Sequence, residues 1–514
     1  MADPLDSGDD IFDRLKKGVD PKLQQEKTRL ANERELARIE KAQRRLGELI
    51  QDNSTLPTTI SSIRILNATN TRRGFLNRIF NPIVSANQDR PYTLAEAIRE
   101  VSIGADKLHK LDIFHEPISL FIDRPAQTDP STTPTDVDIY LSVAEKSRFK
   151  FKTGTDIGNA EGSAYVHGLA RNIFGGAESL NVNASFGTRT RSAYQASFET
   201  PILSNPDLRW ELGGLASSTQ KPWSSHEEVL KGGWMKLRWM TLGGGKHELG
   251  YNGVWRQITG LASNASPSVR GDAGDSVKSS LMHTWVKDRR DSPQLPTIGY
   301  LNKSTLELAG WGPLQGDVAF GKAEVEAQGA IPVPIPGIQG ESGVSLTTGL
   351  RAGLLYPLPL GTESDSKPSR MNDRFQLGGP TDVRGFRLSG LGPRDGSDAL
   401  GGDIYAAASA NLLFPLPRVG KDKPFRFQIF ANGGRLLALK KTDKGVTEGE
   451  KMRQSLSSTM AELGNGLPSM AAGFGLVYAH PVARFELNFS LPLVLRRGED
   501  GRKGLQFGIG INML

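Results

Sequence analysis

The chain of 514 residues contains no cysteine. Disulfide bonds, thiolate metal sites and cysteine nucleophiles are therefore excluded, and the redox compartment is left open. Long apolar runs are also missing, because no stretch approaches the roughly 18 to 20 residues that a spanning helix needs. With 37% hydrophobic residues and a mean hydropathy of −0.36, the chain is too polar for a bundle of membrane helices.

The amino terminus lacks the features of a targeting signal. Its first ten residues are acidic and have no apolar core behind a basic edge, so neither a secretory signal nor a matrix transit peptide is predicted. This argues against an exported bacterial precursor, and residues 1–20 are expected to form a disordered acidic tail. The net charge of +7 is spread along the chain without a basic, aromatic-rich run, so nucleic acid is not an expected partner.

Catalytic motifs are scarce. His247-Glu248 begins a zincin-like motif, but Tyr251 stands where the second histidine ligand would be. The run Gly243–Gly245 lacks the spacing of a phosphate-binding loop and predicts a turn. There is no Gly-x-Ser-x-Gly elbow, and the seven histidines are scattered singly. The sequence therefore predicts no enzymatic activity, no cofactor and no metal site.

Residues 21–51 predict a charged helix, with Asp20 as its N-cap and Pro21 in its first turn. Its apolar positions form a narrow stripe on one face: Leu36, Ile39, Leu46 and Ile50. Such a stripe could dock on a partner, and a solvated helix is an equally good interpretation. We assign it no chemistry.

Residues 55–146 predict a small α+β domain with the element order β-α-α-β-β. Its first helix is expected to end near Pro82, since proline interrupts helical hydrogen bonding. Thr93 and Glu96 have the spacing of a capping box that opens the second helix. Two alternating strands complete the domain.

From residue 147 to the end the hydrophobic period becomes two. A representative strand alternates apolar and polar residues: Arg484, Phe485, Glu486, Leu487, Asn488, Phe489, Ser490 and Leu491. Roughly sixteen such segments recur between turn clusters, with no helical stretch of comparable strength among them. Charged residues on the second face require a wet lumen. This pattern favours an all-β transmembrane barrel of about 16 antiparallel strands.

The stretch Met371–Phe386 stands out within residues 361–402, a long segment of Gly, Pro, Ser and charge without apolar period. Long loops of this kind are more often functional than idle. A loop tip folded into the lumen would bring the Arg384 guanidinium to polar acceptors there. A surface loop with a chance Arg-Gly-Phe remains the alternative.

Val383-Arg384-Gly385-Phe386, preceded by Phe375-Gln376-Leu377-Gly378-Gly379, resembles the sixth-loop signature of the BamA superfamily of barrel-assembly and translocation proteins. The resemblance runs from about Leu56 to Leu514 and is to the mitochondrial branch, the central barrel subunits of the sorting and assembly machinery (SAM complex). Within it, residues 55–146 resemble a single POTRA domain. The carboxyl terminus is similar to a mitochondrial β-signal at four positions: Gln506, Gly508, Ile511 and Met513.

The resemblance implies an insertase that folds precursor β-barrel proteins into the mitochondrial outer membrane, with the POTRA domain facing the intermembrane space. The implied partners are the lipid bilayer, peripheral cytosol-facing subunits of the machinery, and substrates such as porin and the outer-membrane translocase pore. Two alternatives remain open. One is a polypeptide-translocating or conducting pore of the same superfamily, and the other is a soluble all-β binding protein.

The family mechanism implies a lateral gate between the first and last strands, about residues 149–156 and 505–513. The expected gate residues are Phe149, Phe151, Thr153, Gly154, Gln506, Gly508 and Gly510. Glycines offer little side-chain packing and would weaken this seam. Possible lumen partners of Arg384 are Asp403, Asn432 and Glu486. Asn432 occupies the place where bacterial relatives have an acid, which argues against a simple ion pair.

Overall fold

The computed structural model describes residues 47–125, 132–158, 161–334, 342–358, 369–416, 423–439, 448–481 and 483–510, together with Arg29, Leu30, Arg34, Arg38, Lys41, Arg44 and Arg45. The chain forms two compact units, Met1–Thr69 with Arg73–Glu145, and Asn70–Arg72 with Lys146–Leu514. Each described residue between Arg29 and Asp52 is helical. The predicted tail 1–20 lies outside the described residues. So do three residues of the apolar stripe: Leu36, Ile39 and Leu46.

The first unit is a small α+β region built on a four-stranded sheet of order β2-β1-β4-β3. Its elements are β1 (Pro57–Leu66), α3 (Arg73–Asp89), β2 (Tyr92–Thr93), α4 (Leu94–Lys110), β3 (Phe114–Asp123) and β4 (Asp136–Glu145). Strands β1 and β4 pair in parallel, and the other two pairs are antiparallel. The long strand β3 therefore forms one edge of this sheet.

Local sequence explains the two helices of this unit. Helix α4 begins with a reciprocal capping box, in which the Thr93 N–H donates to Glu96 (3.0 Å) and the Glu96 N–H donates to Thr93 Oγ1 (3.3 Å). The expected end of the first helix near Pro82 is wrong, because α3 continues to Asp89. Tertiary contacts hold its last turns: Asn87 accepts from the Ile60 N–H (2.6 Å) on β1 and is fully buried.

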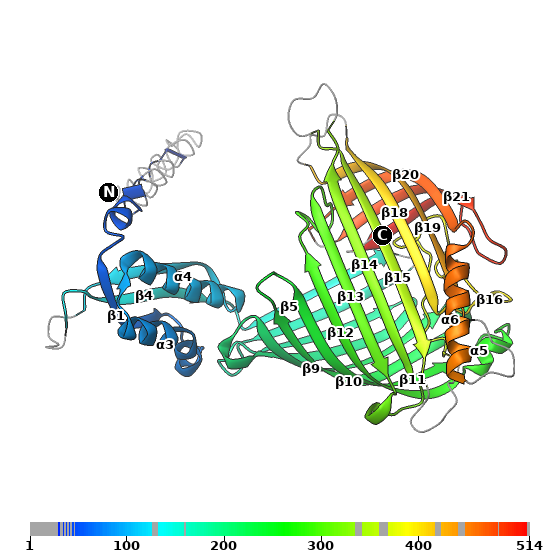
Figure 1. Ribbon diagram of the computed structural model, residues 1–514, viewed down its shortest axis with the longest axis horizontal. Coiled ribbons are helices and arrows are strands. Elements are labelled where there is room, and N and C mark those ends of the chain that lie inside the picture. The colour runs from blue at the N-terminus through cyan, green and yellow to red at the C-terminus, as the bar shows by residue number, and fades with distance from the viewer. Residues whose placement is uncertain are drawn as a thin grey trace, which may run out of the picture. The chain divides into compact units, whose positions relative to one another are not determined.

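The second unit is one antiparallel sheet of sixteen strands, drawn in Figure 1. The expected number of strands is confirmed. The strands are β5 (Phe149–Gly158), β6 (Glu161–Arg171), β7 (Ser179–Gly187), β8 (Thr190–Pro201), β9 (Leu208–Lys221), β10 (His226–Met240), β11 (Lys246–Thr259), β12 (Gly274–Asp288), β13 (Gly299–Ala309), β14 (Phe320–Pro332), β15 (Ser345–Pro357), β18 (Ile404–Pro415), β19 (Phe425–Leu437), β20 (Ser469–Ala479), β21 (Arg484–Val494) and β22 (Gly504–Gly510).

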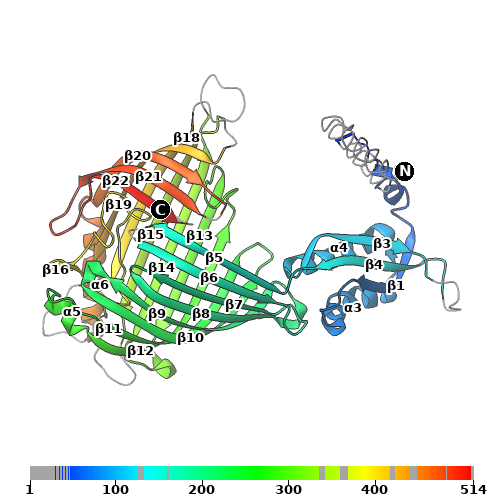
Figure 2. The same cartoon turned by 180° about the vertical axis from the view of Figure 1, so that it is seen from behind.

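The sheet curls round until its two edge strands, β5 and β22, approach each other within 8 Å between Cα atoms (Figure 2). Within the described residues, β5 has a hydrogen-bonded ladder with β6 alone, and β22 with β21 alone. We call the line where these two edges meet the seam. Both edge strands therefore retain one side on which the described backbone has no ladder partner.

The period-two pattern becomes an apolar outer face and a polar inner face. On the last strand, Leu505 and Phe507 point outward and are 63% and 48% exposed, whereas Gln506 between them is buried. Glu486 and Asn488 of the neighbouring strand are buried on the same inner face as Gln506. An exposed apolar band around a polar interior is the arrangement that lipid requires of a barrel.

Shorter elements lie between the barrel strands. They are η1 (Ile202–Ser204), η2 (Pro222–Ser224), α5 (Pro267–Gly271), η3 (Gly312–Leu314), the hairpin β16 (Arg394–Asp395) with β17 (Asp398–Ala399), and α6 (Glu448–Gly464). No helical stretch of comparable strength is predicted among the strands, but helix α6 lies between β19 and β20 in the chain and packs against β18 and β19. Arg435 on β19 donates to the carbonyl oxygens of Glu462, Leu463 and Asn465 and so holds the carboxyl end of α6. Among the helices in the described part of the chain, none is long and apolar enough to cross a membrane.

Candidate functional site

The connection between β15 and β18, residues 358–403, is the sixth loop on its end of the barrel, after those that join β5–β6, β7–β8, β9–β10, β11–β12 and β13–β14. We call it the sixth loop. Five of its apolar side chains are buried in one cluster with residues of the wall that include Phe320, Leu355, Tyr405, Leu436 and Ala471. The loop members of that cluster are Phe375, Leu377, Val383, Phe386 and Leu391. The segment of the loop that contains these residues is therefore packed inside the barrel.

Arg384 at the tip of this loop forms a bidentate ion pair with Glu486 of β21. The Nε–Oε2 and Nη2–Oε1 distances are 2.8 Å and 3.1 Å, and the two side chains are 1% and 0% exposed. Arg384 Nη1 also donates to Asn411 Oδ1 on β18 (3.2 Å), and its guanidinium lies 5.0 Å from the ring centre of Phe430. A forked arginine matched to a carboxylate in this way fixes orientation as well as charge.

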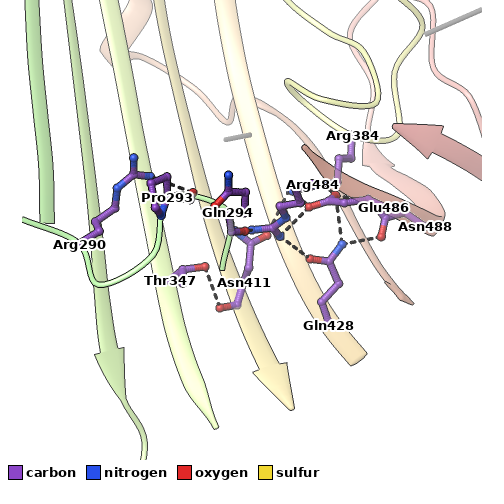
Figure 3. A network of polar contacts seen from close by, with 10 residues as sticks. All are labelled: Arg290, Pro293, Gln294, Thr347, Arg384, Asn411, Gln428, Arg484, Glu486 and Asn488. Carbon is purple, nitrogen blue, oxygen red and sulfur yellow. Dashed lines mark hydrogen bonds and ion pairs between the residues drawn. The ribbon is translucent and has the colours of Figure 1, made fainter. Parts of the chain in front are cut away.

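Glu486 is the centre of a wider polar network on the inner wall (Figure 3). It also accepts from Arg484 (2.6 Å), Asn488 (2.7 Å) and Gln428 (3.2 Å). Gln428 in turn accepts from Arg484 at 3.1 Å. Two arginines and two amides thus surround one buried carboxylate, which compensates its desolvation from several strands at once.

The other two candidate partners of Arg384 lie elsewhere. Asp403 accepts from Ser369 and from the Leu439 N–H (2.9 Å), and it lies 3.8 Å from Arg374 Nε, so it is not the ion-pair partner of Arg384. Asn432 contacts the Arg384 backbone: with its amide turned to satisfy both groups, it accepts from the Arg384 N–H (2.8 Å) and donates to the Arg384 carbonyl (3.2 Å). The doubt about a simple ion pair is wrong, because the carboxylate comes from Glu486.

Gly385 lets the loop tip lie flat against the wall. Its φ is +87°, and a Cβ there would lie 2.5 Å from the Ala471 Cβ, so both backbone and space favour glycine. Gln506 of β22 holds the tip from below: its Oε1 accepts from the Gly385 N–H (2.8 Å) and its Nε2 donates to the Phe386 carbonyl (3.2 Å). The loop tip is thereby attached to the last strand.

Backbone pairing extends this attachment to the β21–β22 connection. Phe386 and Gly501 form an antiparallel bridge, the Arg502 N–H donates to the Gly385 carbonyl (2.8 Å), and the Arg387 N–H donates to the Asp500 carbonyl (3.1 Å). The sixth loop therefore adds a short strand-like segment to the last hairpin, which we define as β21, β22 and residues 495–503.

Sequence reasoning missed a second buried ion pair of the sixth loop. Arg256 of β11 contacts both oxygens of Asp373, at 2.5 Å and 3.1 Å, and the two side chains are 4% and 1% exposed. Lys278 of β12 lies 3.9 Å from the same carboxylate, and Lys322 of β14 donates to the Asp373 carbonyl at 2.8 Å. The sequence contains one indication of this pair: Arg256 occupies an inward-facing position in the alternating pattern of β11, where a charge needs a partner in the lumen. The loop is thus anchored at two walls of the lumen.

The β16–β17 hairpin ties the sixth loop to two neighbouring loops. Ser268 donates to Asp395 through its N–H (3.1 Å) and its hydroxyl (2.7 Å), and these bonds hold the pKa of Asp395 below its ordinary value. Burial alone would raise the pKa of Asp398. Hydrogen bonds from Ser225 (2.6 Å) and from the Ser266 N–H (2.7 Å) outweigh burial and lower that pKa.

The residues expected at the gate lie along the seam. Phe149 and Phe151 of β5 are 65% and 74% exposed, and Thr153 is exposed on the same outward face. At Gly154 a Cβ would lie 2.6 Å from Tyr165 Oη, so this glycine makes room for a side chain. Gly508 lies under the sixth loop, where a Cβ would be 3.2 Å from the Pro380 carbonyl. Gly510 ends β22, and Ile511 and Met513 lie outside the described residues.

In the described parts of the chain, no group of three or more His, Asp or Glu side chains is arranged to hold a metal ion. What the lumen does contain is a loop held by two buried ion pairs inside a curled sheet of sixteen strands. These features define the class of BamA-like β-barrels with an inward-folded sixth loop.

Comparisons with known proteins agree with this class. The Omp85 superfamily domain matches residues 172–513. The chain is 40% identical to the SAM50-like protein of Schizosaccharomyces pombe, over 94% of this chain and 96% of that protein. It is 33% identical to sorting and assembly machinery component 50 homolog A of Xenopus laevis, over 82% and 84%. The chain therefore belongs to the Omp85 superfamily and, within it, to the sorting and assembly machinery component 50 family.

A solved structure shares the fold. BamA from Haemophilus ducreyi lacking POTRA domains 1–3 superposes with a TM-score of 0.66, over 88% of this chain and 84% of that chain, at 15% sequence identity. At that identity the likeness concerns the fold alone. It shows that the curled sheet of the second unit has the fold of the BamA barrel.

Proposed function

We propose that this protein folds precursor β-barrel proteins and inserts them into the mitochondrial outer membrane through the seam between β5 and β22. Its relatives are named as components of a sorting and assembly machinery, and its superfamily and fold are those of outer-membrane barrels. The proposed precursors are proteins such as porin and the outer-membrane translocase pore. The role needs binding and release of strands and no covalent chemistry.

The observation that carries this proposal is the pair of edges at the seam. A strand that enters lipid with unpaired N–H and C=O groups costs several kcal/mol for each group. An edge strand that already stands in the membrane can pair with those groups before the precursor meets lipid. Strands β5 and β22 have ladder partners on one side only within the described residues, so each can act as such a template.

The two edges differ in how firmly they are held. Gln506 of β22 is bound to the sixth loop by two hydrogen bonds in addition to the ladder of β22 with β21, whereas the described ladder of β5 is with β6. We therefore assign β5 as the edge that exchanges partners and β22 as the edge that stays in place. In this scheme the gate glycines allow close approach of neighbouring groups: Gly154 makes room for the Tyr165 side chain, and Gly508 for the backbone at Pro380.

The first unit has the role of a POTRA domain in this proposal and faces the intermembrane space. Its sheet ends in the ten-residue edge strand β3, on which Phe121 is 55% exposed. Extended precursor segments can add to such an edge through backbone hydrogen bonds. Peripheral subunits of the machinery would bind the cytosol-facing loops.

A disulfide across the seam tests the gate. The chain contains no cysteine, so introduced pairs have no background. Thr153 and Phe507 both face outward on the two edge strands, whereas Gly508 faces inward, so we choose paired cysteines at Thr153 and Phe507. Oxidation should stop assembly of imported radiolabelled porin, and reduction should restore it. A control pair at Leu476 and Leu487, opposite each other within the sheet, should have no effect.

The runner-up function is a translocating or conducting pore of the same architecture. In that case cargo crosses the lumen and the seam stays shut. Porin assembly that continues with the seam disulfide formed, together with altered conductance in planar bilayers, would favour the pore and contradict the lateral gate.

A further inference from the structure

A cavity of about 750 Å³ lies where the sixth loop meets the last strand and the β9–β10 connection. Trp223 lines it from that connection, Leu388 and Arg394 from the sixth loop, Arg502 from the last hairpin, and Gln506 and Phe507 from β22. Gln506 faces inward and Phe507 faces outward, so the cavity reaches around the edge of β22 at the seam. It is separate from the buried pair of Arg384 and Glu486.

The charges around this cavity do not balance. Arg387, Arg394 and Arg502 line it, and the single carboxylate among the lining residues is Asp500. Arg387 Nε lies 3.5 Å from one oxygen of Asp500, and Arg394 Nη2 lies 3.8 Å from the other. The Arg502 guanidinium has no ion-pair or hydrogen-bond partner in the described part of the chain. Three cations therefore share one anion.

Hydrogen-bond donors are in excess as well. Arg394 Nε and the indole Nε1 of Trp223 are buried without a partner among the described residues. A buried donor without an acceptor costs free energy, and such groups are rare unless water or a ligand satisfies them. The residues that line the cavity therefore carry an excess of positive charge and of hydrogen-bond donors, and Leu388 and Phe507 add apolar walls beside them.

An anion with several oxygens and an apolar body meets both requirements. Guanidinium groups match phosphate geometry, and the outward face at Phe507 belongs to the apolar band of the barrel. We propose that this cavity binds the phosphoryl headgroup of an anionic phospholipid, with phosphate oxygens on Arg394 and Arg502 and the acyl chains along the outer face of β22. Free phosphate shares the headgroup chemistry and is the alternative source. The inference stands on the cavity and does not depend on the insertase role.

The test uses the full chain, purified in neutral detergent, delipidated and analysed by native mass spectrometry with phosphatidic acid, phosphatidylcholine or inorganic phosphate. The wild-type protein should retain one phosphatidic acid in preference to phosphatidylcholine. Arg394→Gln and Arg502→Gln should each weaken retention about tenfold, as expected for one lost charge-assisted contact. Trp223→Phe, which removes the indole N–H together with the pyrrole part of the ring, should weaken it severalfold.

Arg497→Gln is the matched control, because Arg497 belongs to the same connection, is exposed and does not line the cavity. The electrophoretic shift of the unboiled barrel verifies folding of each variant. Displacement of the lipid by an equal concentration of inorganic phosphate would assign the site to free phosphate. Equal retention by the wild type and the Arg394→Gln/Arg502→Gln double variant, or no retention by either, would overturn the proposal, as would binding of an acidic peptide in place of both phosphate probes.

Discussion

Arg384 can be buried inside the lumen because Glu486 and its neighbours neutralise it there. Removal of one partner from a buried ion pair costs about 3 to 5 kcal/mol, since the remaining charge is left without compensation. Here Arg484 lies 2.6 Å from Glu486 and continues to compensate its charge when Arg384 is removed. The free-energy cost of removing Arg384 should therefore fall at the lower end of that range. The barrel wall should therefore survive the change while the loop tip is released.

The first prediction concerns Arg384→Ala. Assembly of imported radiolabelled porin should fall severalfold in mitochondria that contain only this variant, whereas the variant's own resistance to alkaline carbonate should be unchanged. Arg497→Ala, at an exposed position of the last hairpin, serves as the control. Porin assembly at the wild-type rate would refute the role assigned to the loop tip.

The second prediction concerns the Arg256–Asp373 pair. Asp373→Ala should leave Arg256 buried beside Lys278 and loosen the sixth loop, so that a cysteine placed at the buried Met371 reacts with maleimide at least about tenfold faster. In the double variant Arg256→Ala/Asp373→Ala, the increase in the logarithm of the maleimide reaction rate should be smaller than the sum of the increases in the two single variants. Each single substitution already breaks the same ion pair.

Asp291→Asn is the control for that cycle, since Asp291 bonds to Thr297 in a different connection. If the effects of the two alanine substitutions on the logarithm of the reaction rate were additive, the interaction between Arg256 and Asp373 would not contribute to holding the sixth loop.

The residues of the site differ in how far the sequence could predict them. The Val-Arg-Gly-Phe string is local, so Arg384 could be found directly. Its partner Glu486 lies 102 positions away, and the choice among Glu486, Asp403 and Asn432 depends on strand register and on the path of the loop. Asp373 lies in the same stretch but has no distinguishing neighbours in sequence, and its partner Arg256 is 117 positions distant.

Among the elements, the hairpin β16–β17 is held by hydrogen bonds that only charged carboxylates can accept fully. Asp395 and Asp398 both have pKa values below the ordinary aspartate value, so the unfolded chain binds protons more readily than the docked hairpin. Docking is thus fully stabilised above the ordinary pKa and is lost as the pH falls through the lowered values.

The third prediction follows from that sign. Amide hydrogen exchange of residues 394–399, corrected for its intrinsic pH dependence, should stay slow from pH 8 to pH 5 and accelerate only below about pH 4. Asp398→Asn should exchange faster already at neutral pH, because the amide oxygen can accept only one of the two bonds from Ser225 and Ser266 and the NH2 group cannot accept the other. Acceleration between pH 7 and pH 6 would contradict the assignment.

The elements themselves were predictable to different degrees. Strand periodicity is a local property of each segment, so the sixteen barrel strands could be counted from alternation alone. Helix α6 escaped notice because Ser455, Ser457, Ser458 and Thr459 interrupt its apolar pattern, and its position depends on contacts of its carboxyl end with Arg435 of the preceding strand β19. For α3 the error was in the other direction, because the sequence predicted that the helix ends near Pro82 and the structure continues it to Asp89. The contact of Asn87 with β1 stabilises the turns beyond the proline.

At the scale of the whole molecule, the sixth loop joins parts of the barrel that are far apart in sequence. Its described partners include Arg256 of β11, Asn411 of β18 and Glu486 of β21. The tip is completed by Gly501 and Gln506, both near the carboxyl terminus. The loop can therefore reach its full set of contacts only in a barrel that contains the last hairpin.

The fourth prediction tests that dependence. A single cysteine at Val383, which is fully buried at the loop tip, should be shielded from maleimide in the complete chain. In a chain that ends before Arg484 the same cysteine should react freely, because Glu486, Gly501 and Gln506 are missing. Equal shielding in both chains would show that the other walls hold the tip unaided.

The attachment of the loop tip to the last hairpin also sets a sequence of events in the biogenesis of this protein itself. Residues 486–506 are synthesised after the sixth loop, so the loop tip must wait for a later part of the polypeptide before it can dock. A docked tip therefore marks a barrel whose last hairpin is already in place.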